Sequence, residues 1–306
     1  MTAPRLTVST ALLLLVPPLM WAANAVLGRV VQDMVPPVML NLLRWLLAFA
    51  LLLPLAGWVL RPGSGLWTHW RRFSLLGLLS IGGYNTLQYM ALQTSTPVNV
   101  TLVASSMPVW MLLMGRVLYG VPVTRRSALG AALSIVGVAV VLARGDLGGL
   151  LAVRLVPGDA LMVLAALVWS WYSWLLARPV NPPEPAAIKG DWAAYLMAQM
   201  ALGLGWSALL AGAEWVVLPA AAWHIDWSPG LVAALFFFAI GPSLLAYRAW
   251  GTGVARVGPG PAVFFANLTP LFAALLSGAL LGEWPQAYHA LGFVLIVGGI
   301  LVSARR

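Results

Sequence analysis

Ten long apolar stretches follow one another along the chain, separated by short polar segments. Each has the roughly 20 residues that a helix needs to cross about 30 Å of hydrocarbon. Their apolar residues run continuously and do not alternate with polar ones, which indicates helices and not the strands of a membrane barrel. The pattern predicts an all-α polytopic membrane protein with ten transmembrane helices, at residues 9–31, 38–60, 70–93, 97–119, 125–144, 157–177, 191–213, 229–252, 260–281 and 285–304.

The longest connecting segment, residues 178–190, contains four prolines. Proline removes a backbone donor and favours extended chain over helix. We therefore expect a linker or a flexible loop between the sixth and seventh helices.

Composition supports lipid as the solvent. The chain is 61% hydrophobic and 8% charged, with a mean hydropathy of +0.92, whereas a soluble domain has about 25% charged residues. A net charge of +9 would suggest nucleic acid as the partner of a soluble protein. Here the basic residues are scattered between apolar stretches, so the expected partners are membrane lipid and a small-molecule substrate, with no nucleic acid.

Basic residues are distributed unequally between the two ends of the predicted helices. With the N-terminus inside, thirteen fall on the inner side, three on the outer side, and Arg44 lies within the second helix. By the positive-inside rule we expect both termini to be cytoplasmic. The predominance of Arg over Lys and the Ala-rich stretches suggest a GC-rich bacterial genome, so the expected location is a bacterial inner (cytoplasmic) membrane. The inner thirteen are Arg5, Arg61, Arg71, Arg72, Arg116, Arg125, Arg126, Arg178, Lys189, Arg248, Arg256, Arg305 and Arg306, and the outer three are Arg29, Arg144 and Arg154.

The chain contains an internal repeat. A displacement of 162 residues superposes 97–144 on 259–306 without a gap, and 13 of the 48 pairs are identical. Matched prolines and glycines recur among them, and these residues constrain the backbone in a way that chance matches of Leu and Ala do not. Five helices per half invert the second half in the membrane. We therefore expect a first repeat at 1–150 and an inverted second repeat at 151–306 around a central cavity, an arrangement common in secondary transporters.

The matched residues suggest two structural roles. Pro108 and Pro270 are expected mid-helix as kinks that act as hinges, with Ser105, Ser106 and Asn267 close to the freed backbone groups. Glycines seven residues apart, Gly130 with Gly137 and Gly292 with Gly299, predict close packing of the fifth helix against the tenth, or alternatively a homodimer contact. The expected state is a monomer or a weak homodimer.

Aromatic and amide side chains are concentrated in a few helices, where they could line a substrate cavity. The alternatives are an interfacial belt for Trp and Tyr and hydrogen bonds between helices for the amides. In the third helix positions 85, 88 and 89 share a face. The candidate substrate-binding residues are Trp21, Asn24, Tyr84, Asn85, Gln88, Tyr89, Trp169, Tyr172, Tyr247 and Asn267.

Arg44 is the only basic residue well inside a predicted helix. Its planar guanidinium could bind the α-carboxylate of an amino acid. Alternatively it has a structural role, extending toward the outer surface or binding helix-end carbonyls.

The chain has few residues that could carry protons, bind a metal or catalyse a reaction. No Asp or Glu lies in the middle third of a predicted helix, so we expect facilitated diffusion or exchange without a carboxylate proton carrier. The chain has no Cys, and its three His lie far apart in sequence. No metal site, cofactor or enzymatic centre is therefore expected.

Several features together resemble the EamA branch of the drug/metabolite transporter superfamily. They are the five-plus-five helices, Trp21-Ala22-Ala23-Asn24, Arg44-Trp45, the proline-containing fourth and ninth helices, and Gly282-Glu283 before the tenth. The first-repeat counterpart of that last pair is Gly120-Val121, so the glutamate is not required in both halves. Within the branch, the density of Trp and Tyr is similar to that of YddG-type exporters of aromatic amino acids.

The resemblance implies a secondary transporter that exports aromatic and other neutral amino acids, or related metabolites, by alternating access. A broad-specificity exporter of neutral metabolites or drugs is the second possibility. A nucleotide-sugar exchanger is the third, since a diphosphate would require more than one buried basic residue.

Overall fold

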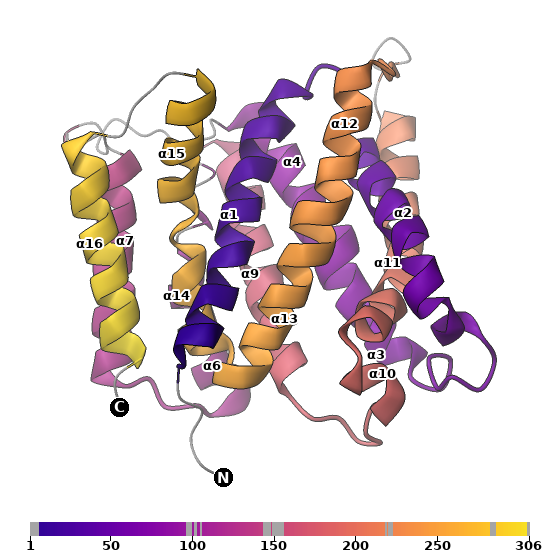
Figure 1. Ribbon diagram of the computed structural model, residues 1–306, viewed down its shortest axis with the longest axis horizontal. Coiled ribbons are helices and arrows are strands. Elements are labelled where there is room, and N and C mark those ends of the chain that lie inside the picture. The colour runs from indigo at the N-terminus through magenta and orange to yellow at the C-terminus, as the bar shows by residue number, and fades with distance from the viewer. Residues whose placement is uncertain are drawn as a thin grey trace.

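The computed structural model describes residues 6–95, 100, 103–104, 106–142, 148, 156–217, 219, 223–281 and 286–304. Within these residues the regular structure is helical throughout, as the apolar pattern predicts. Figure 1 shows the helices side by side in one bundle, with α1 beginning and α16 ending at the same end of it. We call this end the N/C face and the other end the opposite face.

The helices follow the predicted stretches closely, with several of them divided. Five helical segments in the described part of the chain are long and apolar enough to cross a membrane: Val8–Gly28, Pro37–Leu60, Pro157–Ala177, Trp192–Val217 and Pro229–Val257. The elements are α1 (Val8–Val30), α2 (Pro37–Ala56), η1 (Gly57–Leu60), α3 (Trp70–Gly77), η2 (Leu78–Tyr84), α4 (Asn85–Thr94), α6 (Met107–Tyr119), α7 (Arg125–Leu142), α9 (Pro157–Ala177), α10 (Ala186–Gly190), α11 (Trp192–Val217), α12 (Pro229–Phe238), η4 (Ala239–Leu245), α13 (Ala246–Val257), α14 (Pro259–Ala266), α15 (Thr269–Leu281) and α16 (Ala287–Ala304).

Polar side chains satisfy the backbone donors at the helix starts. Thr7 and Ser228 cap α1 and α12 through their hydroxyl oxygens, as expected for N-cap residues. The start of α2 is capped from another helix, because the Glu214 carboxylate accepts the backbone N–H groups of Val38 and Met39, each at 3.0 Å. The negative charge also complements the positive end of the α2 dipole.

Two long helices each contain a π-helical segment, and the two segments lie at nearly equivalent positions of the sequence repeat. η2 (Leu78–Tyr84) joins α3 to α4, and η4 (Ala239–Leu245) joins α12 to α13. A displacement of 162 residues brings the two segments into register to within one residue. π-helical turns are rare and occur frequently at functional sites, so both segments direct attention to the middle of these two long helices.

The matched prolines stand where helices begin. Pro108 lies in the first turn of α6 and Pro270 in the first turn of α15, so the mid-helix position expected from the sequence is wrong for both. Proline ends the preceding helix because it lacks the N–H group and its ring clashes with a carbonyl of the turn before it. The Ser106 and Thr269 hydroxyls donate to the carbonyls of Val103 and Ala266. Ser105 lies outside the described residues.

Helices that the 162-residue displacement brings into register pack on partners from the other part of the chain. α4 packs on α9 and its equivalent α13 packs on α1, while α6 packs on α9 and its equivalent α15 packs on α1. Figure 1 shows α7 beside α16 at one edge of the bundle.

The predicted glycine seam between the fifth and tenth helices is confirmed. A Cβ atom on Gly130 would lie 2.7 Å from the carbonyl oxygen of Gly299, and one on Gly137 would lie 2.9 Å from that of Gly292. Only glycine permits this approach of α7 and α16, because any side chain would overlap with the facing backbone. The seam lies within one chain, so these glycines face each other and not a second copy.

The segment 178–190 is held in place and is not a free linker. It contains α10, and its Glu184 side chain is buried against α3 and α11. Pro185 lies directly over Gly65, where an added Cβ would overlap with the proline ring. The proline content correctly indicates the absence of a long helix, but it does not reveal this anchoring.

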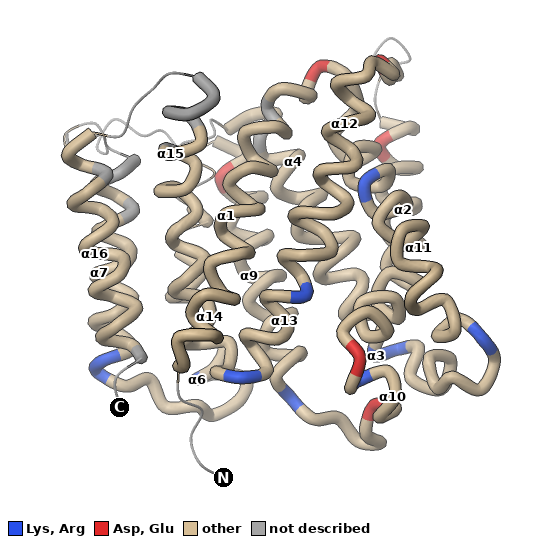
Figure 2. Tube along the Cα trace, viewed as in Figure 1, with Lys and Arg blue, Asp and Glu red and all other residues tan. Residues whose placement is uncertain are grey.

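Charged residues are distributed unequally in space as well as in sequence. Figure 2 shows most of the Lys and Arg positions at the N/C face, while several Asp and Glu positions lie at the opposite face. The asymmetry found by counting along the chain thus exists at the two ends of the folded bundle.

Candidate functional site

Six aromatic rings meet in the interior of the bundle around Trp169. The Trp169 ring centroid lies 5.0–5.7 Å from those of five neighbours, the separation at which edge-to-face and tilted aromatic pairs are favourable. We call these residues the Trp169 cluster: Trp21 from α1, Tyr84 from η2, Trp169 and Tyr172 from α9, and Tyr247 and Trp250 from α13.

Hydrogen bonds hold two outer side chains of the Trp169 cluster, Tyr247 and Trp250, but not the central indole. The Tyr247 hydroxyl donates to the carbonyl of Ser80 at 3.0 Å, and the Trp250 indole donates to the Ser173 hydroxyl at 3.2 Å. The indole N–H of Trp169 is buried and has no partner among the described residues. A buried donor without an acceptor is unusual in a native interior, which makes the centre of the cluster a candidate for ligand contact.

A second cluster surrounds Arg44 in α2. Its guanidinium donates to the Asn24 amide oxygen at 3.2 Å and to the Tyr89 hydroxyl at 2.9 Å, and Tyr89 in turn donates to Asn24 at 3.2 Å. All three side chains are buried, and Arg44 is only 1% exposed. We call them the Arg44 cluster.

The two clusters are neighbours. α1 supplies Trp21 to the Trp169 cluster and Asn24 to the Arg44 cluster. The continuous helix formed by η2 and α4 supplies Tyr84 to the Trp169 cluster and Tyr89 to the Arg44 cluster. At 1.5 Å per residue these pairs are separated by roughly 4.5 and 7.5 Å along their helices. Trp45 also connects the clusters, since its ring packs edge-on against Tyr247 at 5.0 Å. The Arg44 cluster therefore lies about one helical turn nearer the opposite face.

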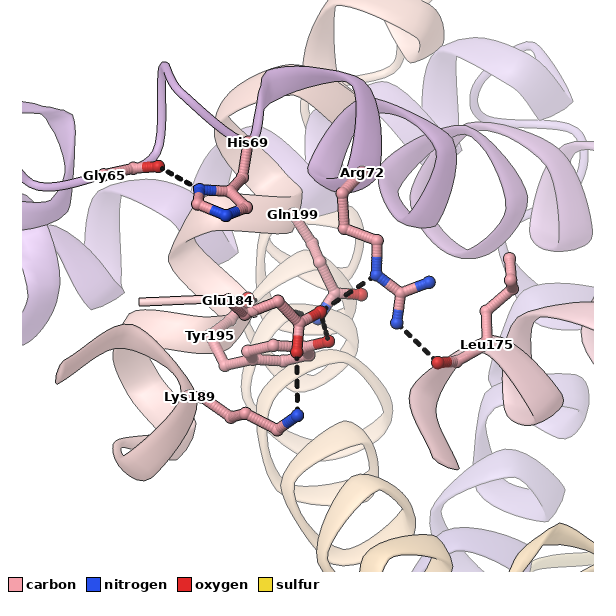
Figure 3. A network of polar contacts seen from close by, with 8 residues as sticks. All are labelled: Gly65, His69, Arg72, Leu175, Glu184, Lys189, Tyr195 and Gln199. Carbon is pink, nitrogen blue, oxygen red and sulfur yellow. Dashed lines mark hydrogen bonds and ion pairs between the residues drawn. The ribbon is translucent and has the colours of Figure 1, made fainter. Parts of the chain in front are cut away.

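An ion-pair network at the N/C face was not anticipated from the sequence (Figure 3). The Glu184 carboxylate accepts hydrogen bonds from Arg72 Nε and the Tyr195 hydroxyl, both at 2.9 Å, and lies 3.1 Å from Lys189 Nζ. Burial alone raises the pKa of Glu184, but the hydrogen bond and the charge of Arg72 outweigh it and hold the pKa below its ordinary value. Arg72 also donates to the carbonyl of Leu175 at the end of α9. The network thus joins α3, α9, α11 and the 178–190 segment.

A cavity of about 380 Å³ lies at the N/C face. Its wall includes Gly115 of α6, Trp174 of α9 and Phe264 of α14. Trp174 packs directly on Gly115 and donates its indole N–H to the carbonyl of Met111 at 2.9 Å. None of the residues expected to bind substrate lines this cavity, but α9 passes from it to the Trp169 cluster.

Most of the candidate residues named from the sequence are gathered in the two clusters. Asn85 is buried beside the Tyr247 hydroxyl. Gln88 is half-buried and, among the described residues, forms no hydrogen bond with either cluster. Asn267 is buried in the break between α14 and α15, and its amide nitrogen has no partner in the described part of the chain.

Sequence reasoning missed several residues of the interior. Trp250 was detectable, because the repeat superposes it on Gln88, and Trp45 follows Arg44 inside the second helix. Glu184 gave no signal, since an acid in a proline-rich segment is normally expected to be solvated. Its burial depends on Arg72, which lies 112 residues earlier in the chain.

A bundle of apolar, membrane-length helices around a buried aromatic and polar interior is the architecture of a polytopic membrane transporter. A family model described as the EamA-like transporter family matches residues 8–143 and 156–305. The chain belongs to this family.

Three curated relatives are similar over most of their length. An uncharacterized transporter of Archaeoglobus fulgidus is 26% identical, with 97% of this chain and 98% of the relative covered. The aromatic amino acid exporter YddG of Ancylobacter novellus is 25% identical over 80% of this chain and 77% of that protein. The uncharacterized inner membrane transporter YedA of Escherichia coli is 24% identical over 93% and 87%.

One solved crystal structure has the same fold. It superposes with a TM-score of 0.73 and 23% sequence identity, and the match covers 96% of both chains. Together with the membrane-length helices and the similarity to an inner membrane transporter, the family places the protein as a multi-pass transporter of the inner membrane. The expected general function, transport of a small molecule by a non-enzymatic membrane protein, agrees with this family.

Proposed function

We propose that the protein is a secondary transporter that exports aromatic and other neutral amino acids. The observation that supports this most directly is the Trp169 cluster, in which rings from four helical elements surround one indole whose N–H has no partner among the described residues. Aromatic walls with a few polar groups favour an aromatic side chain. The similarity to an aromatic amino acid exporter supports both the substrate class and the direction of transport.

The proposed architecture is ten transmembrane helices in two inverted repeats, 1–150 and 151–306. The two π-helical segments, the paired helix contacts and the reciprocal glycine seam support it. The concentration of basic residues at the N/C face supports a cytoplasmic location for this face and for both termini.

The proposed mechanism is alternating access by facilitated diffusion, without a carboxylate proton carrier. Acidic side chains among the described residues lie toward the ends of the bundle, as with Glu184 and Glu214, and not in the Trp169 cluster. The helix breaks before Pro108 and Pro270 are the proposed hinges, since a break already divides the helix into two parts that can move separately. In this conformation the rings of the cluster contact one another, so a substrate ring enters only when one of them moves aside.

The test is flux of labelled phenylalanine and threonine from liposomes containing the purified protein. In the Trp169→Ala variant, loss of two ring contacts of about 0.5–1.5 kcal/mol each should lower the apparent affinity for phenylalanine about 5- to 150-fold. Threonine transport should change less. Trp171→Ala is the matched control, because Trp171 lies on the same helix but is 36% exposed.

Three results would count against the proposal. Equal losses for both amino acids would indicate a packing role for Trp169. A strict requirement for a pH gradient would contradict facilitated diffusion. Absence of amino-acid flux in the unaltered protein would exclude this substrate class.

A further inference from the structure

The Arg44 cluster contains buried hydrogen-bond donors for which the described residues provide no anion. The partners of the guanidinium are neutral, the amide oxygen of Asn24 and the hydroxyl of Tyr89. The Nε atom of Arg44 and the indole nitrogen of the adjacent Trp45 are both buried without a partner among the described residues. Among the described residues the two ion pairs are those of Glu184 with Arg72 and Lys189, and they lie at the N/C face, far from Arg44.

A carboxylate matches this set of donors. Its two oxygens accept about four hydrogen bonds, and a guanidinium binds it through two parallel N–H groups in one plane. Buried charges are normally paired, and a charge within the membrane is retained where it has a function. The unused donors of Arg44 and Trp45 therefore favour an acceptor that comes from outside the chain.

The position of these donors suits an aromatic amino acid. They lie about one helical turn from the Trp169 cluster, because Trp21 and Asn24 stand three residues apart on α1. Trp45 bridges the two, with its ring on Tyr247 at 5.0 Å and 5.2 Å from the Arg44 guanidinium carbon. One turn of helix is comparable to the length of an aromatic side chain measured from its carboxylate.

We propose that Arg44 and the indole N–H of Trp45 bind the α-carboxylate of the transported amino acid while its ring lies among those of the Trp169 cluster. This inference rests on the proposed function and adds to it the group that selects amino acids from other aromatic solutes. Asn24 and Tyr89 orient the guanidinium, so that its remaining N–H groups are available to the ligand.

A purely structural role for Arg44 is the competing explanation. Its bonds to Asn24 and Tyr89 join α2 to α1 and α4, and this connection exists whichever substrate is bound. Loss of the connection would affect all substrates alike. A carboxylate site affects only substrates that have a carboxylate, and this difference is measurable.

The experiment compares L-phenylalanine with L-phenylalaninamide, which keeps the ring and the amine but replaces the carboxylate by a neutral amide. Transport by purified protein in liposomes is measured for the unaltered chain and for Arg44→Gln, Arg44→Lys and Trp45→Phe. Arg256→Gln is the matched control, because it makes the same change at an arginine that contacts Thr10 and neither cluster. Thermal melting in detergent reports whether each variant is folded.

For Arg44→Gln we expect an apparent affinity for phenylalanine about 10- to 100-fold weaker, the range for hydrogen bonds to a charged group, with phenylalaninamide unchanged. Arg44→Lys should retain part of the preference for phenylalanine, and Trp45→Phe should weaken phenylalanine binding to a smaller extent. Arg256→Gln should behave as the unaltered protein does.

Equal changes for the two substrates in Arg44→Gln, or no change in either, would overturn the carboxylate site and leave the proposed function intact. If Arg44→Gln does not fold, a folded Arg44→Lys variant whose preference for phenylalanine over phenylalaninamide is reduced supports the site, and one that behaves as the unaltered chain for both substrates overturns it. If the unaltered protein transports neither compound, the proposed function fails and this inference fails with it.

Discussion

Replacement of Glu184 by glutamine tests whether the ion-pair network at the N/C face stabilises the fold. The Glu184 side chain is 1% exposed and that of its partner Arg72 is 10% exposed, whereas Lys189 is 50% exposed. Glutamine keeps the volume and removes the charge. The glutamine amide oxygen can still accept a hydrogen bond from Arg72. The charge of Arg72 is, however, left buried without an anionic partner, with only this neutral oxygen and the carbonyl of Leu175 as acceptors.

The expected loss follows from these exposures. Removing one partner of a buried ion pair costs about 3–5 kcal/mol, and the half-exposed pair with Lys189 adds only about 0–1 kcal/mol. At about 2–4 °C per kcal/mol for a large domain, Glu184→Gln should lower the melting temperature by roughly 6–24 °C at pH 7. Thermal melting of purified protein in one detergent measures this directly.

The pH dependence of this difference provides a second check. Because the pKa of Glu184 is lower in the folded protein, its contribution to stability is fully present above the unfolded value of about 4.3. It is lost as the pH falls below that value toward the lower folded pKa. The gap between the two melting curves should therefore be constant near neutral pH and should close only in acid.

The control is Asp33→Asn, the same change of charge at an exposed residue of the opposite face. Exposed substitutions of this kind alter stability by about 0.5 kcal/mol or less. If Glu184→Gln melts together with Asp33→Asn, the network does not stabilise the fold, and the burial of Glu184 has no energetic consequence.

Two further changes test packing and capping. Gly299→Ala should lower the melting temperature, because its Cβ would meet the Gly130 carbonyl at 2.6 Å and overpacking costs about 1–3 kcal/mol. A Cβ added at Gly298 on the same helix would have no atom within 4 Å, so Gly298→Ala should leave the melting temperature unchanged. Equal losses in the two variants would exclude the glycine seam as the cause of the destabilisation. Glu214→Ala should destabilise the start of α2 by about 0.5–2 kcal/mol, seen as faster hydrogen exchange of Val38 and Met39, and unchanged exchange would show that the carboxylate does not cap this helix.

The length and continuity of the apolar stretches predicted the helices well, because a helix that crosses a membrane needs about 20 consecutive apolar residues. The end of α9 at residue 177 and the end of α6 at residue 119 agree with the sequence to the residue. The matched glycines also predicted one tertiary contact, since their only physical use at seven-residue spacing is a close approach of two helices. The helix breaks were less accessible, because a proline ends or kinks a helix according to the partners its surroundings provide.

The candidate site was predicted in composition but not in arrangement. The helical period placed Asn85, Gln88 and Tyr89 on one face, yet Tyr89 contacts Arg44 while Gln88 is only half-buried. The preceding π-helical segment η2 changes the phase of the helix, and no composition rule marks where such a segment begins. Trp45 was not selected because nothing in the sequence shows that its ring reaches Tyr247, 202 residues later.

The seam between α7 and α16 is reciprocal, with Gly130 against Gly299 and Gly137 against Gly292. Contacts exchanged in this way are those of a two-fold dimer, in which residue i meets j and j meets i. One polypeptide therefore contains an interface of the kind that two identical half-length chains would form about an axis. A gene fusion of such chains would fix their stoichiometry and would let the two copies diverge in sequence.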